Sequence, residues 1–316
     1  MTVATWLDSL EDVEPVDPAE LAQLRAELED EARREMDAVA GRIDPDLWPI
    51  RLPKQRLADL ERCPRSALAR FRATTDAPPG AAVLRGTALD QFVAHQLVVG
   101  RVREPLADLS SMLRAAADDV SLQLLDELGE QRSRELVEPL AGAVAESWGG
   151  IDPRWVPQVQ SRAALVLADG ACVCSGVVDV EFGGRGTGRP GVVIEVKSGA
   201  AAAAHVHEIY LYALLVALRD REAPVVVARW YPGADPSGPK VTLGVLEAAA
   251  ARLVAGLRTW TELLAGGPAP ERAGGWCSWC PDEAVCPSAR LARSGADSDP
   301  GSFEGGLDDG AADPGW

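Results

Sequence analysis

The segment SRAALVLADGACVCSGVVDVEF, residues 161–182, constrains the fold more than any other part of the chain. Apolar and polar residues alternate on both sides of Asp169–Gly170, and Asp-Gly between two such runs is the strongest short signal of a β-hairpin. A Gly-rich stretch follows and leads into an apolar β-branched run at 192–197. The sequence therefore predicts a hairpin and a further strand in close succession.

Helical periodicity dominates the rest of the chain. Leu21, Leu24 and Leu28 lie among Glu and Arg residues and predict a surface helix over 17–41. Further elements are expected as follows: a short basic helix at 54–72, a helix after the Pro-Gly loop at 79–80, helices over 104–147 with a break near Gly129, helices at 202–220 and 247–265, and strands at VVVARWY and KVTLGVL. Strands mixed with helices in this way predict an α/β fold.

The length of 316 residues, with 47% hydrophobic and 25% charged residues, is typical of a globular protein with one large domain and appendages. We expect an acidic extension with a helix at 1–47, one domain at 48–293 with a helical insertion at about 104–147, and a disordered acidic tail at 294–316. No stretch approaches the roughly 18 apolar residues that cross a bilayer, and the N-terminus lacks a secretory signal. The expected location is the cytoplasm, without membrane partners.

The net charge of −17 is concentrated at the two ends of the chain. Residues 1–47 hold 14 acids and 4 bases, and residues 294–316 hold 6 acids and no base, so residues 48–293 carry a net charge of only −1. Within that part, residues 51–72 hold seven bases and two acids. This run is either a phosphate-facing stripe or a solvated helix face.

The run VVIEVKS, residues 192–198, places two opposite charges inside an apolar strand. Side chains alternate along a strand, so Val193, Glu195 and Lys197 share one face. Burying two charges costs several kcal/mol each, so such a pair marks chemistry more often than stability. A generic cation here would be arginine, because the chain has 28 arginines and three lysines, Lys54, Lys197 and Lys240.

A second carboxylate is expected beside this pair. In the preceding strand Val177, Asp179 and Glu181 share one face and Val178, Val180 and Phe182 the other, so alignment of the two strands brings Asp179 to Glu195. Carboxylate oxygens are the ligands that Mg²⁺ prefers, and such a metal activates a bound water. A neighbouring lysine orients that water or stabilises the transition state.

Ordered motifs over about residues 55–287 carry a resemblance to a known family. GVVDV followed by IEVKSG resembles the D…(D/E)xK signature of PD-(D/E)XK nucleases. RLADLERCP resembles the first cysteine helix of RecB-type and AddB-type exonucleases, RGTALD their G-x-x-x-H helix, and HEIYLYALL their Q-x-x-x-Y helix. The resemblance implies a restriction-endonuclease-like mixed sheet flanked by helices.

The resemblance also implies roles for individual residues. Asp179, Glu195 and Asp90 would hold Mg²⁺ or Mn²⁺, Lys197 would support the nucleophile, and Tyr212 with Glu208 would line the path of the DNA strand. Two positions depart from the family pattern, because Asp90 replaces the expected histidine and Glu208 the expected glutamine. Both departures add negative charge, which is expected to weaken the approach of phosphate.

The cysteines form a second motif. WCSWCPDEAVCP gives Cys277, Cys280 and Cys286, and Cys63 is a fourth ligand candidate. Cys172 and Cys174 alternate within the hairpin and are expected in the core. Four thiolates suit either a structural zinc or an iron–sulfur cluster, and spacing does not choose between them. The RecB-type and AddB-type resemblance favours a 4Fe-4S cluster that joins the two ends of the domain.

The leading functional hypothesis is a Mg²⁺- or Mn²⁺-dependent deoxyribonuclease. The resemblance implies an exonuclease that acts on DNA, single-stranded or with free ends, in repair, recombination or defence, with any helicase or repair partner on another chain. One alternative is a catalytically decayed iron–sulfur subunit that binds DNA or serves as a scaffold. Another is a zinc-stabilised protein unrelated to nucleic acid.

Overall fold

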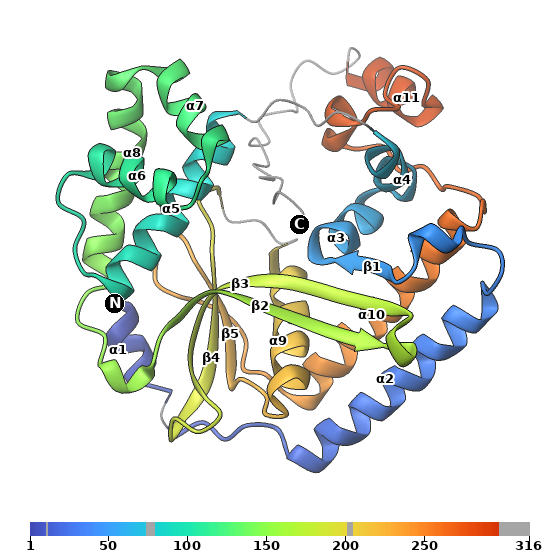
Figure 1. Ribbon diagram of the computed structural model, residues 1–316, viewed down its shortest axis with the longest axis horizontal. Helices are drawn as coiled ribbons and strands as arrows, with labels where there is room; N and C mark the ends of the chain where they lie inside the picture. The colour runs from blue at the N-terminus through green and yellow to red at the C-terminus, as the bar shows by residue number, and fades with distance from the viewer. Residues whose placement is uncertain (11, 74–79, 201–204, 297–316) are drawn as a thin grey trace.

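The computed structural model describes residues 1–10, 12–73, 80–200 and 205–296. Within these residues the chain forms a five-stranded mixed sheet with helices on both faces (Figure 1). The strands are β1 (Ile50–Pro53), β2 (Gln158–Leu167), β3 (Cys172–Gly184), β4 (Arg189–Val196) and β5 (Val226–Trp230). Their order is β1-β3-β4-β5, with β2 also paired to β3. The predicted α/β class is confirmed.

The pairing of the strands combines a meander with two parallel contacts. β2 and β3 form the predicted antiparallel hairpin, and Asp169 at its turn has a φ of 52°. β3 and β4 are antiparallel, while β1 runs parallel to β3 and β5 parallel to β4. The end of β4 therefore lies at the same edge of the sheet as the end of β5.

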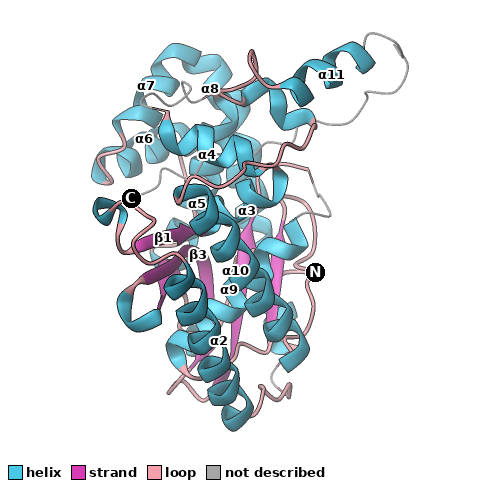
Figure 2. Cartoon of the chain, turned by 90° about the vertical axis from the view of Figure 1, so that its right-hand side faces the viewer, coloured by secondary structure: helices cyan, strands magenta, loops and turns pink. Residues whose placement is uncertain are grey.

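Eleven α-helices lie within the described residues. They are α1 (Val3–Asp8), α2 (Pro18–Ala38), α3 (Lys54–Arg62), α4 (Pro64–Arg72), α5 (Ala81–Val98), α6 (Pro105–Ala115), α7 (Asp119–Leu128), α8 (Glu130–Ser147), α9 (His205–Asp220), α10 (Leu243–Leu264) and α11 (Pro287–Ala296). Figure 2 shows α2, α9 and α10 covering the sheet. Helices α5 to α8 gather on its other side (Figure 1).

Three expected elements differ from the structure. The basic helix at 54–72 is broken at Cys63, which is extended because it precedes Pro64. The 104–147 segment forms three helices instead of two. The predicted strand KVTLGVL is wrong, since only Lys240 forms a bridge to the sheet and Thr242 caps the start of α10 by accepting from the N–H of Val245.

Two hydrophobic cores lie on the two faces of the sheet. The first packs α2, α9 and α10 against β2, β3 and Val193 of β4. The second packs α1 and α5 to α8 against Val192, Ile194 and Val196, so β4 contributes alternate residues to each core. Trp148 anchors the second core, with its ring centroid 5.3 Å from that of Trp230. Burial on both faces makes β4 a rigid support for whatever its end carries.

The N-terminal residues pack against both cores. Leu24 and Leu28 of α2 are buried in the first core, and Leu7 of α1 in the second. The expected boundaries at residues 47 and 293 stay predictions. The expected tail, apart from its first three residues, lies outside the described residues. No helix of the described part is long and apolar enough to cross a membrane.

Candidate active site

Glu195 is the centre of a buried charge cluster at the end of β4. The ammonium groups of Lys54 and Lys197 each lie 2.9 Å from Oε1 of Glu195. Lys197 also lies 2.9 Å from Oε2 of Glu208, in the first turn of α9. Burial acts to raise the pKa of Glu195, but Lys54 and Lys197 together lower it to about 2. Glu195 is therefore an anion at neutral pH.

Asp179 reaches the same cluster from β3. The β3–β4 ladder ends at the Val180–Ile194 pair, and beyond it the N–H of Val196 donates to Oδ2 of Asp179 at 2.7 Å. Burial, and then the charges of Glu195 and Asp90, raise the pKa of Asp179 well above its ordinary value. The structure thus brings Asp179, Glu195 and Asp90 of α5 within electrostatic range of one another.

The alternation predicted for β3 holds only in part. Val180 and Phe182 pack in the second core, as one face, but Val178 packs in the first. The irregularity falls at Asp179, because the opposing residue Gln160 has a φ of 49° and forms no ladder pair with it. This local interruption leaves the Asp179 carboxylate available to Val196.

Tyr212 lies beneath the cluster. Its side chain is 1% exposed, and Nζ of Lys54 lies 4.7 Å from the centre of its ring. A Cβ on Gly176 of β3 would come 2.7 Å from Cε1 of Tyr212, so only glycine leaves room for the ring. The structure gives Tyr212 a packing role under Lys54, and a role in lining the path of a DNA strand stays a prediction.

Lys54 is the residue of this cluster that sequence reasoning did not assign. It follows β1 and begins α3, and its side chain is 15% exposed. Burial acts to lower its pKa, but the carboxylates of Glu195 and Asp179 and, more weakly, Glu208 raise it above its ordinary value. The scarcity of lysine was the available signal, because two of the three lysines of the chain contact the same oxygen atom.

The donor set of the cluster fits a hard divalent cation. Oε2 of Glu195 is buried and has no hydrogen-bond partner, and Oδ1 of Asp179 accepts from Gln160 at the long distance of 3.4 Å. A buried carboxylate oxygen left without a partner is costly, so these atoms are suited to bind a cation. As the side chains stand, no group of three or more His, Cys, Asp or Glu residues in the described part is gathered closely enough to hold a metal ion.

The cysteine segment lies against the start of α4. The N–H of Arg272 donates to Sγ of Cys63 at 3.4 Å, and the thiol of Cys286 hydrogen-bonds Glu271. Cys63 and Cys286 therefore touch the same short segment, although Cys277 and Cys280 are not joined to them in any metal group of the described residues. All six cysteines are free thiols, and Cys172 and Cys174 are buried, as expected.

Several bases of the run 51–72 have internal partners. The guanidinium of Arg56 lies 4.6 Å from the ring of Trp260 and donates to the carbonyl of Ala67. Arg65 donates to Glu271 at 2.6 Å and to Asp282 at 3.0 Å, so it fastens α4 to the cysteine segment. These two side chains are structural and are not free to bind phosphate.

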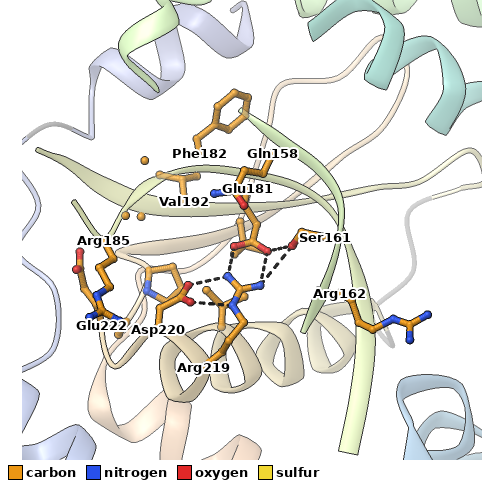
Figure 3. A pocket seen from close by; sticks show the side chains of 17 residues that line it. Gln158, Ser161, Arg162, Glu181, Phe182, Arg185, Val192, Arg219, Asp220 and Glu222 are labelled. Atoms are coloured by element: carbon orange, nitrogen blue, oxygen red, sulfur yellow. Dashed lines mark hydrogen bonds and ion pairs between the residues drawn. The ribbon is translucent and has the colours of Figure 1, made fainter. Parts of the chain in front are cut away.

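A second charged cluster occupies the opposite end of β4. Here a cavity of about 440 Å³ is lined by Glu181 of β3 and Arg219 of α9, among others (Figure 3). Arg219 donates to both carboxylate oxygens of Glu181, at 3.0 and 2.6 Å, and Ser161 also donates to Glu181. The carboxylate in this cavity is already neutralised, so it is a poor candidate for a metal site.

Comparison with known proteins identifies the class. The sequence profile of the PD-(D/E)XK nuclease superfamily matches residues 51–287, about three quarters of the chain. The chain therefore belongs to the PD-(D/E)XK nuclease superfamily, whose members are typically nucleases that use a divalent metal such as Mg²⁺ or Mn²⁺. The matched residues contain the whole Glu195 cluster.

Similarity to individual proteins is weak. A solved structure titled "Crystal structure of SSO0001" aligns with 13% sequence identity and a TM-score of 0.31, over 83% of this chain and 96% of that chain. Likeness at this level carries no argument about function. No curated protein matches the chain significantly.

Proposed function

We propose that this chain is a Mg²⁺- or Mn²⁺-dependent deoxyribonuclease of the RecB/AddB type, an exonuclease that acts on single-stranded DNA or on free DNA ends. The observation that carries the proposal is the unpartnered Oε2 of Glu195, which lies in a cluster with Asp179 and Asp90 inside the matched family region. A cytoplasmic role in repair, recombination or defence, with a helicase or repair partner on another chain, is part of the proposal.

Asp179, Glu195 and Asp90 are the residues that would hold the metal. Bound there, a divalent cation supplies an acidic water and neutralises charge on the scissile phosphate. Lys197 stands beside Glu195 with its ammonium shared between two carboxylates, from where it can donate a hydrogen bond to the attacking water or to a phosphate oxygen. Glu208 positions Lys197, and together with Tyr212 it is assigned to the path of the DNA strand.

We further propose a 4Fe-4S cluster on Cys63, Cys277, Cys280 and Cys286, with Zn²⁺ as the alternative metal. The support is that Cys63 and Cys286 contact the same segment, Pro270 to Arg272, although they lie far apart in the sequence. Cys277 and Cys280 are only partly buried, so modest rearrangement of their short helix brings them to a shared ion. Such a cluster would close a long loop and stabilise the domain.

The test of activity uses purified full-length protein with end-labelled linear and circular DNA in Mn²⁺. Wild type is expected to degrade linear DNA and to spare closed circles, because an exonuclease needs an end. Lys197→Ala is expected to lose the activity, while Lys240→Ala, outside the cluster, serves as a matched control that retains it. Equal digestion by Lys197→Ala rejects the assignment, and DNA binding without cutting in any divalent metal identifies a decayed subunit instead.

The test of the cluster is the iron, acid-labile sulfide and zinc content of protein purified without oxygen. Four irons and four sulfides per chain are expected, with loss of both in Cys286→Ser. One zinc and no iron would replace the proposed cluster by a structural zinc site.

A further inference from the structure

Lys54 does not serve the stability of its own helix. It is the first residue of α3, and the N-cap residue Pro53 makes no side-chain cap. The N-terminus of a helix carries a partial positive charge, so a lysine at this position is unfavourable and an acid is preferred. Its ammonium instead contacts Glu195, 141 residues away in the sequence. The reason for a lysine at position 54 therefore lies in the Glu195 cluster.

The cluster contains more acids than bases. Its charged side chains are Asp90, Asp179, Glu195, Glu208, Lys54 and Lys197. With all four carboxylates ionised and both lysines protonated, these side chains sum to a charge of −2. One divalent cation brings the cluster to zero, whereas without Lys54 the same cation would leave a charge of −1.

The residual charge matters because the substrate is an anion. A phosphodiester carries one negative charge and approaches a neutral site more readily than a negative one. Lys54 also occupies Oε1 of Glu195, which leaves only Oε2 of that carboxylate open to a cation. The same ammonium thus removes one potential ligand and one unit of negative charge.

We propose that Lys54 sets the net charge of the candidate active site, so that a single divalent cation neutralises the site and a phosphodiester can then enter it. Lys54 is a positioning residue and not a catalytic one. It offsets the negative charge that Glu208 adds, and the two side chains act as a compensating pair. This inference rests on the proposed nuclease function for its substrate and on the Glu195 cluster alone for its cation.

The experiment measures Mn²⁺ binding by electron paramagnetic resonance of the free ion, at one pH, in the full-length protein. Lys54→Met removes the charge and frees Oε1 of Glu195, so the Kd for Mn²⁺ is expected to fall at least about tenfold. Glu208→Gln removes one negative charge and is expected to raise the Kd by a similar factor. Lys54→Met combined with Glu208→Gln restores the net charge and is expected to return the Kd close to that of wild type.

DNA cleavage gives a second readout. Lys54→Met is expected to raise KM for DNA at least about fivefold, because the metal-loaded site then repels phosphate, and the double variant is expected to recover. Lys54→Arg keeps the charge and should stay near wild type in KM. Lys240→Met, a lysine outside the cluster, is the matched control and should change neither quantity.

The outcomes separate a charge-setting role from a purely structural one. An unchanged or weaker affinity of Lys54→Met for Mn²⁺ overturns the proposal, as does a failure of Glu208→Gln to reverse the effect, because a lost packing contact would not be repaired by a distant amide. If Lys54→Met does not fold, Glu208→Gln alone decides, and an unchanged Kd rejects the idea. Absence of Mn²⁺ binding to wild type also rejects it. The expected order of affinities without DNA cleavage by wild type supports the charge role and rejects only the nuclease function.

Discussion

Glu181 and Glu195 are two buried glutamates from neighbouring strands, 6% and 3% exposed, and they are held in opposite ways. Arg219 donates to both oxygens of Glu181, which leaves that carboxylate saturated (Figure 3). Two lysines contact a single oxygen of Glu195 and leave the other without a partner. Similar burial therefore accompanies very different capacities to bind a further ligand.

The difference follows from the chemistry of the two cations. The planar guanidinium of arginine matches both oxygens of a carboxylate, whereas an ammonium is a point charge that contacts one. A chain with 28 arginines uses arginine where a carboxylate is to be neutralised, as at Glu181. At Glu195 it uses two of its three lysines, which hold the carboxylate ionised and keep one oxygen open.

The largest expected effect comes from exchanging each glutamate for glutamine. Glu195→Gln removes the anionic ligand and is expected to lower the rate of DNA cleavage in Mn²⁺ by roughly a thousandfold. Glu181→Gln is expected to leave the rate per folded molecule unchanged, since its carboxylate is occupied by Arg219. Initial rates, normalised to the folded fraction from circular dichroism, check this. A comparable loss of rate in both variants would remove the functional distinction between the two ends of β4.

The second effect reverses the order of the two sites and concerns stability. Arg219→Leu leaves the buried Glu181 without its main partner and is expected to lower the free energy of unfolding by about 3 kcal/mol, the lower end for a broken buried pair because Arg219 is partly exposed. Urea denaturation measures this. Lys54→Leu is the counterpart at the other site and should destabilise less, because Glu195 keeps Lys197. A larger loss for Lys54→Leu would show that its ion pair is the stronger support of the fold.

Sequence reasoning anticipated the interactions that are local and missed those that depend on pairing at a distance. Glu195 and Lys197 are neighbours by strand alternation alone, so their contact was predictable. Lys54 reaches Glu195 only because β1, a strand of four residues, runs parallel to β3, and nothing in the sequence near β1 announces that pairing. Val178 departed from the expected face because the irregularity arises from Gln160 on the other strand of the hairpin.

The third prediction concerns pH and the unequal protonation of the cluster. Asp179 has a folded-state pKa raised well above its ordinary value of 3.8, so the metal-free folded protein binds a proton that the unfolded chain releases. Stability therefore falls as pH rises from about that value toward the raised pKa. Asp179→Asn removes this loss and is expected to be more stable than wild type at neutral pH in EDTA, with the difference vanishing near pH 3.8.

Chemical denaturation across that pH range, without and with Mn²⁺, measures the effect. Glu181→Gln serves as the control, because its site lacks the crowding of carboxylates around Asp179 and should show no such gain at neutral pH. Mn²⁺ is expected to stabilise wild type and to have little effect on Asp179→Asn. Equal stability of wild type and Asp179→Asn at neutral pH would show that Asp179 is not crowded by the other carboxylates.

The smallest expected effect tests whether the Glu195 end depends on shape as well as charge. Gly176→Ala would press a methyl group against the ring of Tyr212, which lies beneath Lys54, and overpacking of this kind costs about 1–3 kcal/mol. Gly142 lies inside α8, where an added methyl group would meet no heavy atom within 4 Å, so Gly142→Ala is the matched control and is expected to stabilise by about 0.5–1 kcal/mol. Displacement of the ring should also disturb Lys54, so Gly176→Ala is expected to alter Mn²⁺ affinity while Gly142→Ala leaves it unchanged. A loss of stability in Gly176→Ala with unaltered Mn²⁺ affinity would show that Lys54 holds Glu195 without support from Tyr212.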